Sequence, residues 1–199
     1  VVAFAVTACA SETQQTPPSG TSEGSAHSTP GGQSFEVTDA TPDALALVDW
    51  AFARFETAGL PEPAVRRINF AAGTPGCRDL GGWATTGEDK AEITVCMDMS
   101  RICHRDFDDV VFTVAGRMCI LHELSHLWLS QYSPEPVAEE FMNLVDARSW
   151  RDPDVPWKER GVEQAADTIA WGLLGETIEI LGRPLPPCEL LHDGFMILT

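Results

Sequence analysis

The chain has 199 residues, of which 44% are hydrophobic, and 13 basic side chains stand against 30 acidic ones. This length and apolar content suit one folded domain with tails, large enough to bury a core. The net charge of −17 repels phosphate backbones and anionic lipid headgroups, so the composition argues against a nucleic-acid-binding protein.

The first residues, VVAFAVTACAS, combine a short apolar run with small residues and one cysteine. The run resembles the end of a secretory signal, and the stretch from Val6 to Cys9 resembles a bacterial lipobox. The resemblance implies that 1–9 is the remnant of a signal, that Cys9 carries a lipid, and that the protein is anchored to the cell membrane outside the cytoplasm. A truncated ordinary signal, or a buried strand with a chance cysteine, remains an alternative.

Residues 10–34 contain no large apolar side chain. A segment of this composition cannot bury enough surface to offset the entropy lost on ordering. We therefore expect a disordered tether over 10–34, followed by one folded domain over 35–199.

The sequence of the first half of that domain predicts one helix and a small sheet. A helix is predicted over 42–58, between a proline that suits a first turn and a glycine that suits an end. Short runs at 65–72, 82–86 and 91–97 predict the strands of a mostly antiparallel sheet.

The second half is predicted to be helical. Apolar residues at helical spacing indicate a helix over 108–132, which the sequence SPEP ends. A short helix is expected over 137–147 and a longer one over 158–179. The expected fold class is therefore α+β.

The chain has six cysteines, Cys9, Cys77, Cys96, Cys103, Cys119 and Cys188. Outside the cytoplasm they are able to form disulfides. Cys77 and Cys96 bracket a predicted hairpin and are the first expected pair, and Cys103 with Cys188 is the second. Cys119 is then a buried thiol, although sequence alone does not determine the connectivity.

The segment His122-Glu123-Leu124-Ser125-His126 lies within the apolar helix predicted over 108–132. Residues four apart share a helix face, so both imidazoles can bind one cation. Glu123 stands next to His122, where its carboxylate can reach a metal-bound water. A bound zinc lowers the pKa of its water towards ~7, and the glutamate accepts the proton as the hydroxide attacks a carbonyl.

A catalytic zinc takes three protein ligands and keeps one open position. The six residues after His126 contain no histidine, so the metzincin pattern is excluded. Glu163 and Asp167 stand four apart on a predicted helix, which resembles the second motif of gluzincin zinc metallopeptidases. The resemblance implies that Glu163 is the third ligand and that Asp167 orients His122 by a hydrogen bond.

Glu139 and Glu140 are alternative ligands, although neither has an aspartate four residues later. Gluzincins often hold the developing oxyanion with a tyrosine or histidine. Tyr132, the one tyrosine of the chain, is the expected residue for this role, and His104 and His192 are alternatives.

The resemblance also implies a minimal zincin-like domain, in which a small sheet packs on an active-site helix and a glutamate helix. A peptide substrate would add to an edge strand of the sheet, which we expect at 91–97 or nearby. Within these 199 residues we expect no counterpart of the large C-terminal helical domain of longer gluzincins.

Taken together, these patterns predict a lipid-anchored, extracytoplasmic zinc peptidase that hydrolyses peptide bonds with Glu123 as general base. A binding or scaffold protein with a structural or vestigial zinc site is the alternative from another class. A zinc hydrolase that acts on a non-peptide amide or ester is a further alternative.

Overall fold

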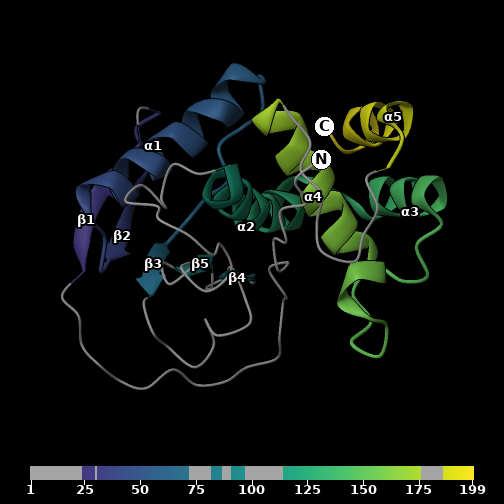
Figure 1. The fold of residues 1–199 in the computed structure, drawn as a ribbon, viewed down its shortest axis with the longest axis horizontal. Helices are drawn as coiled ribbons and strands as arrows, with labels where there is room; N and C mark the ends of the chain where they lie inside the picture. Colours follow the sequence, from purple (N-terminus) through teal and green to yellow (C-terminus); the bar gives the residue numbers. More distant parts are fainter. Residues whose placement is uncertain (1–23, 30, 72–81, 87–90, 97–113, 176–185) are drawn as a thin grey trace.

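The computed structural model describes residues 24–29, 31–71, 82–86, 91–96, 114–175 and 186–199. Within these residues, α-helices and one five-stranded sheet form the predicted α+β fold (Figure 1). None of the helices in the described part is both long enough and apolar enough to cross a membrane.

The sheet has the strand order β1-β2-β3-β5-β4. Its strands are β1 (Ser25–Ser28), β2 (Ser34–Thr38), β3 (Arg67–Ala71), β4 (Gly82–Thr85) and β5 (Glu92–Cys96). β1 and β4 run antiparallel to their neighbours, whereas β3 is parallel to both β2 and β5. The expected mostly antiparallel sheet is therefore wrong, and the sheet is mixed.

The parallel pairing follows from the first helix, α1 (Pro42–Thr57), which links β2 to β3. Parallel neighbours need a crossover connection, and α1 provides it. The hydroxyl of Thr41 caps this helix by accepting a hydrogen bond from the backbone N–H of Ala44. The sequence pattern did not predict the crossover because it indicated no strand ahead of the helix.

The disorder expected over 10–34 is wrong for 24–29 and 31–34, which the structure describes as ordered. β1 is antiparallel to β2, with Ser25 opposite Val37 and Ser28 opposite Ser34. Backbone hydrogen bonds order this polar segment, which has no large apolar side chain of its own. His27 adds a 2.8 Å contact from Nε2 to Oδ1 of Asp49 on α1. Residues 1–23 lie outside the described part of the chain.

The strand expected at the sheet edge, 91–97, is also misplaced. β5 lies between β3 and β4, so it is an internal strand. The two edge strands are β1 and β4, and β4 packs beside the helix that carries the two motif histidines.

The helices of the second half are α2 (Val114–Tyr132), α3 (Glu135–Val145), the short 3₁₀ helix η4 (Trp157–Glu159), α4 (Gly161–Leu174) and α5 (Cys188–Leu198). They include the three predicted ones in the predicted order, together with η4 and α5. The helix predicted over 158–179 begins later, because the chain first makes the 3₁₀ turn. It ends at Gly175, which has a positive φ of 79° that glycine adopts without strain. Residues 108–113 of the predicted motif helix lie outside the described part.

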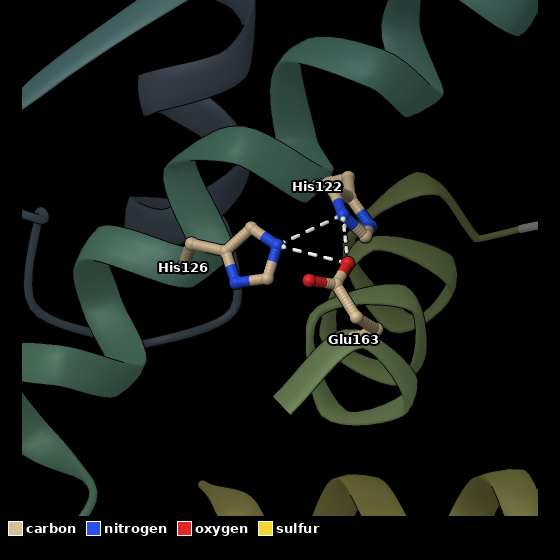
Figure 2. A group of neighbouring side chains, drawn as sticks. All are labelled: His122, His126 and Glu163. Atoms are coloured by element: carbon tan, nitrogen blue, oxygen red, sulfur yellow. Dashed lines mark hydrogen bonds and ion pairs between the residues drawn. The ribbon is translucent and has the colours of Figure 1, made fainter. Parts of the chain in front are cut away.

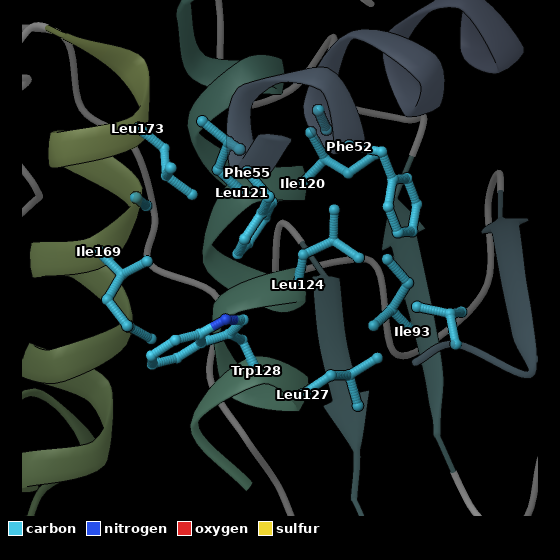
Figure 3. Packing of buried hydrophobic residues seen from close by; sticks show 14 of the residues in the cluster. Phe52, Phe55, Ile93, Ile120, Leu121, Leu124, Leu127, Trp128, Ile169 and Leu173 are labelled. Atoms are coloured by element: carbon cyan, nitrogen blue, oxygen red, sulfur yellow. The ribbon is translucent and has the colours of Figure 1, made fainter. Parts of the chain in front are cut away.

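α2 is the central helix of the molecule. Figure 3 shows α4 on one side of it, with α1 and strands of the sheet on the other. Leu121, Leu124 and Leu127 are fully buried in this position. Ile169 of α4 and Phe55 of α1 are buried in the same core, so α2 is covered on several sides. Polar groups in the middle turns of α2, such as His122 and His126, therefore face protein instead of water.

The cysteines agree only in part with the prediction. Cys96 is disulfide-bonded, but its expected partner Cys77 lies outside the described residues. Cys119 is a buried thiol, as predicted. Cys188 is an exposed thiol at the start of α5, so the expected pairing of Cys103 with Cys188 is wrong.

Gly82 sets how closely β4 approaches β5 and α2. A Cβ atom there would lie 2.5 Å from the carbonyl oxygen of Thr94 and 3.3 Å from Cγ of Glu123. We expect Gly82→Ala to lower the free energy of unfolding by about 1–3 kcal/mol, since backbone must move to admit the methyl group. Chemical denaturation measures the change. Thr85→Ala, at an exposed position of the same strand, should stay within about 0.5 kcal/mol of the parent. Equal stability of parent and Gly82→Ala would contradict the close approach.

Candidate metal centre

The central turns of α2 bury three ionisable side chains. His122, Glu123 and His126 are 3%, 1% and 6% exposed. A buried ionisable group costs several kcal/mol unless other groups compensate it. The two histidines are one helical turn apart and lie on the same face of α2, so a single partner can serve both.

That partner comes from α4. Glu163 is fully buried, and its Oε2 lies 3.4 Å from Nε2 of His122 and 3.4 Å from Nε2 of His126. The two Nε2 atoms are 3.0 Å apart (Figure 2). The structure thus brings together the three residues that the two sequence motifs singled out. One atom from each converges on a common point, and the cluster could hold a metal ion.

Asp167 fixes the orientation of His122. Its Oδ1 lies 2.7 Å from Nδ1 of His122, and both side chains are buried. A carboxylate accepts hydrogen bonds, so Nδ1–H of the imidazole is the donor. The lone pair of Nε2 then points towards His126 and Glu163, which is the tautomer a metal ligand needs. This is the hydrogen bond that the second motif predicted.

The electrostatics of the cluster favour a cation. Burial by itself lowers the pKa of His122, but Asp167, Glu163 and Glu123 together raise this pKa well above its ordinary value. Burial by itself raises the pKa of Glu163, but the nearby His126 and His122 bring this pKa far below its usual range. Glu163 is therefore ionised, and neither of its oxygens has a hydrogen bond of good geometry. Buried acceptors of this kind are satisfied by an ordered water or by a positive ion, and a metal ion is compatible with this cluster.

Glu123 lies close to β4. The backbone of Gly82 leaves room for its side chain, because a Cβ atom there would lie 3.3 Å from Cγ of Glu123. Its charge is close enough to contribute to the raised pKa of His122. Contact with a metal-bound water remains a prediction from the motif.

A cavity of about 200 Å³ opens beside the cluster. His126 and Glu163 form part of its wall, and Ala84 of the edge strand β4 forms another part. Arg151 and Arg160 also line it, and sequence reasoning missed both. Arg160 directly precedes α4 and has an extended backbone, so helical spacing from Glu163 gave no signal for it. Arg151 had no signal either.

The structure does not bring Tyr132 to the cluster. Tyr132 is 42% exposed, and its hydroxyl donates to the carbonyl oxygen of Glu62 at 3.2 Å. Ten residues separate it from His122, which amounts to about 15 Å along a helix and a different face. The prediction that Tyr132 stabilises an oxyanion is therefore wrong.

Three residues that the sequence suggested for the oxyanion or the third ligand lie away from the cluster. His192 is an exposed residue of α5 that contacts its neighbour Asp193. Glu139 and Glu140 are exposed on α3, so neither replaces Glu163 as a ligand. His104, the second histidine suggested for the oxyanion, lies outside the described residues.

No protein-family model matches the chain, and no curated protein is similar enough to match it. The function must therefore be argued from the residues of this cluster and their surroundings.

Asp167→Asn tests the role of the hydrogen bond to His122. The amide no longer requires a proton on Nδ1, so we expect the affinity for divalent metal ions to fall roughly 10–100-fold. Competition of zinc or cobalt ions against a chromogenic chelator measures this affinity. Asp193→Asn removes a carboxylate from an exposed His–Asp contact on α5 and should leave the affinity unchanged. Equal affinity in the parent and Asp167→Asn would contradict the orienting role.

Proposed function

We propose that this protein is a zinc metallopeptidase of gluzincin type, with His122, His126 and Glu163 as the zinc ligands. The observation that carries the proposal is the buried cluster of these three residues, drawn from two helices, with Asp167 behind one histidine. Both motifs of the resemblance thus contribute to one site.

The dimensions of the cluster suit zinc. Ligand atoms about 2.0–2.1 Å from a tetrahedral zinc lie roughly 3.3–3.4 Å from one another. The three separations here are 3.0, 3.4 and 3.4 Å. Two imidazoles and one carboxylate are also a ligand set that catalytic zinc sites use. These separations support zinc over the larger calcium ion, which prefers more oxygen ligands at 2.3–2.6 Å.

The cavity supports a catalytic role over a structural one. Structural zinc sites are closed by four protein ligands, whereas catalytic sites keep one position open. His126 and Glu163 both line the cavity, so this side of the cluster is open to a small molecule. A structural site would also have no use for a glutamate beside the first histidine.

Each residue then has a role in hydrolysis. Zinc, when bound, supplies a water of lowered pKa and polarises the substrate carbonyl. Glu123 would act as the general base, taking a proton at its carboxylate and returning it to the leaving amine. Asp167 keeps the proton of His122 on Nδ1, so that Nε2 stays available as a ligand.

Substrate binding is proposed at β4. As an edge strand, β4 can accept an extended peptide as a further strand, with backbone hydrogen bonds that do not depend on sequence. Ala84 of this strand lines the cavity beside the metal ligands. A peptide bound along β4 would therefore pass the cluster.

We also propose that the protein works outside the cytoplasm, held at the membrane by a lipid on Cys9. The disulfide of Cys96 supports this compartment, because such bonds persist in oxidising surroundings. The lipid on Cys9 depends on the lipobox resemblance alone.

Metal analysis of the purified chain tests the ligand set. We expect one zinc per chain in the parent and strongly reduced retention in Glu163→Ala, because two imidazoles alone bind the ion weakly. Elemental analysis after exhaustive dialysis measures the content. Glu140→Ala removes an exposed glutamate of α3 and should retain the metal. A folded parent that takes up no zinc would contradict the proposal and favour a binding protein with a relic site.

Glu123→Gln separates catalysis from metal binding. We expect peptide hydrolysis to fall by roughly 10²–10⁴-fold, since the amide cannot accept the proton, while the zinc content stays the same. Fluorescence-quenched peptide libraries measure the turnover. Glu139→Gln on the exposed face of α3 is the matched control and should keep full activity. Unchanged turnover in Glu123→Gln would show that the proposed mechanism is wrong.

A further inference from the structure

The cavity beside the metal cluster carries two arginines that the proposed hydrolysis does not use. Arg151 and Arg160 line it together with the metal ligands His126 and Glu163. The chain has only 13 basic side chains against 30 acidic ones. Two positive charges at one small cavity therefore stand out from a surface of opposite sign.

Neither arginine is neutralised by a neighbouring carboxylate in the part of the chain that the structure describes. Arg67 pairs with Glu36 and Glu92, and Arg148 pairs with Glu159. No such pair forms at Arg151 or Arg160 within the described residues, although Asp152 and Asp154 lie in the same loop. Both charges are thus available to a ligand.

Arg160 is held in place before any ligand arrives. Its Nε donates to the carbonyl oxygen of Val155 at 2.9 Å, and its Nη2 donates to that of Pro153 at 3.0 Å. A guanidinium has five N–H groups, so three remain for other acceptors. A side chain fixed in this way loses little entropy when it binds a ligand.

The loop that carries Arg151 is also hydrogen-bonded to the start of α4. The backbone N–H of Gly161 donates to the carbonyl oxygen of Ser149 at 2.8 Å, and that of Val162 donates to Trp150 at 3.1 Å. Arg151 follows directly and is exposed. Its backbone position is therefore set relative to Glu163, while its side chain can adapt.

We propose that Arg151 and Arg160 bind a carboxylate of the peptide substrate, held in this cavity next to the scissile bond. This inference rests on the proposed function, because it names the substrate class of the same site. Arginine is suited to carboxylates, since its planar fork makes two parallel hydrogen bonds to them. The carboxylate belongs either to an aspartate or glutamate side chain or to the C-terminus of a short peptide.

The size of the cavity agrees with one amino-acid residue. Sites for drug-sized ligands occupy roughly 300–1,000 Å³, and this cavity measures about 200 Å³. The remaining wall residues, Ala84, Thr86 and Val162, are small. The cavity thus selects a single charged residue, while β4 binds the peptide backbone without regard to sequence.

The experiment is equilibrium binding of labelled peptides to the full-length, zinc-treated Glu123→Gln chain, which binds without turnover. Three peptides of one backbone are compared. The first has a free C-terminal carboxylate and a glutamine side chain, the second has an amidated C-terminus and glutamate, and the third has an amidated C-terminus and glutamine. We expect one of the two acidic peptides to bind roughly tenfold or more tightly than the neutral third peptide. The peptide that does so identifies the source of the carboxylate.

Variants of the two arginines connect the preference to this cavity. In Arg151→Gln the preference should fall below about threefold, and Arg151→Glu should favour a lysine peptide instead. Arg160→Gln should also lower the preference for the acidic peptide. An unchanged midpoint of thermal unfolding of this variant is the control that the loop has kept its fold. Arg148→Gln removes an exposed arginine that pairs with Glu159 outside the cavity, and it should keep the full preference.

Equal binding of all three peptides, or a preference that survives both Arg151→Gln and Arg160→Gln, would overturn the inference. Hydrolysis by the parent chain is measured separately on the same peptides. A carboxylate preference without hydrolysis would support the arginine site and contradict the proposed peptidase activity. Hydrolysis without any carboxylate preference would support the peptidase and contradict the arginine site.

Discussion

The docking of α2 against α4 depends on ionisable groups that neither helix could bury alone. His122 and His126 are inside the core on one helix, and Glu163 and Asp167 are inside it on the other. Each would cost several kcal/mol if left without a partner, so the two helices must meet at one register. Pairs of this kind add little net stability, because desolvation offsets their attraction. Apolar contacts of residues such as Leu121 and Ile169 stabilise the interface instead.

The same docking creates the open side of the site. α2 contributes His126, α4 contributes Glu163, and β4 approaches from the sheet with Ala84. β4 is able to lie this close because Gly82 has no side chain at the point where the strand meets Glu123. The cavity is therefore a product of three elements that are far apart in the sequence. It places a cluster that could hold a metal ion beside an edge strand.

The loop before α4 adds charge to that combination. Arg151 and Arg160 are among the few basic residues of a strongly acidic chain, and the loop holds both at the cavity wall. Hydrogen bonds from Gly161 and Val162 back to Ser149 and Trp150 keep this loop against the start of α4. The same contacts thus set the positions of α4 and of the two arginines.

The sequence alone determined the features that depend on local spacing. The two histidines four residues apart, and the glutamate and aspartate four apart, predicted the shared helix faces that the structure contains. Apolar periodicity located α1 and α2 for the same reason, because a helix repeats every 3.6 residues whatever surrounds it. The buried state of Cys119 followed from its place on that apolar helix.

Only the tertiary structure decided what depends on long-range pairing. Ser25–Ser28 has a composition that predicts disorder, and it becomes a strand because β2 offers a partner for its backbone. β5 is internal and β4 is at an edge because strand order is set by packing, which sequence spacing does not encode. Packing also decides that Tyr132 lies away from the metal cluster and that Arg151 lines the cavity. The side chains that line a cavity are determined by how separate elements pack together. The local sequence pattern of one element does not indicate which other elements lie beside it.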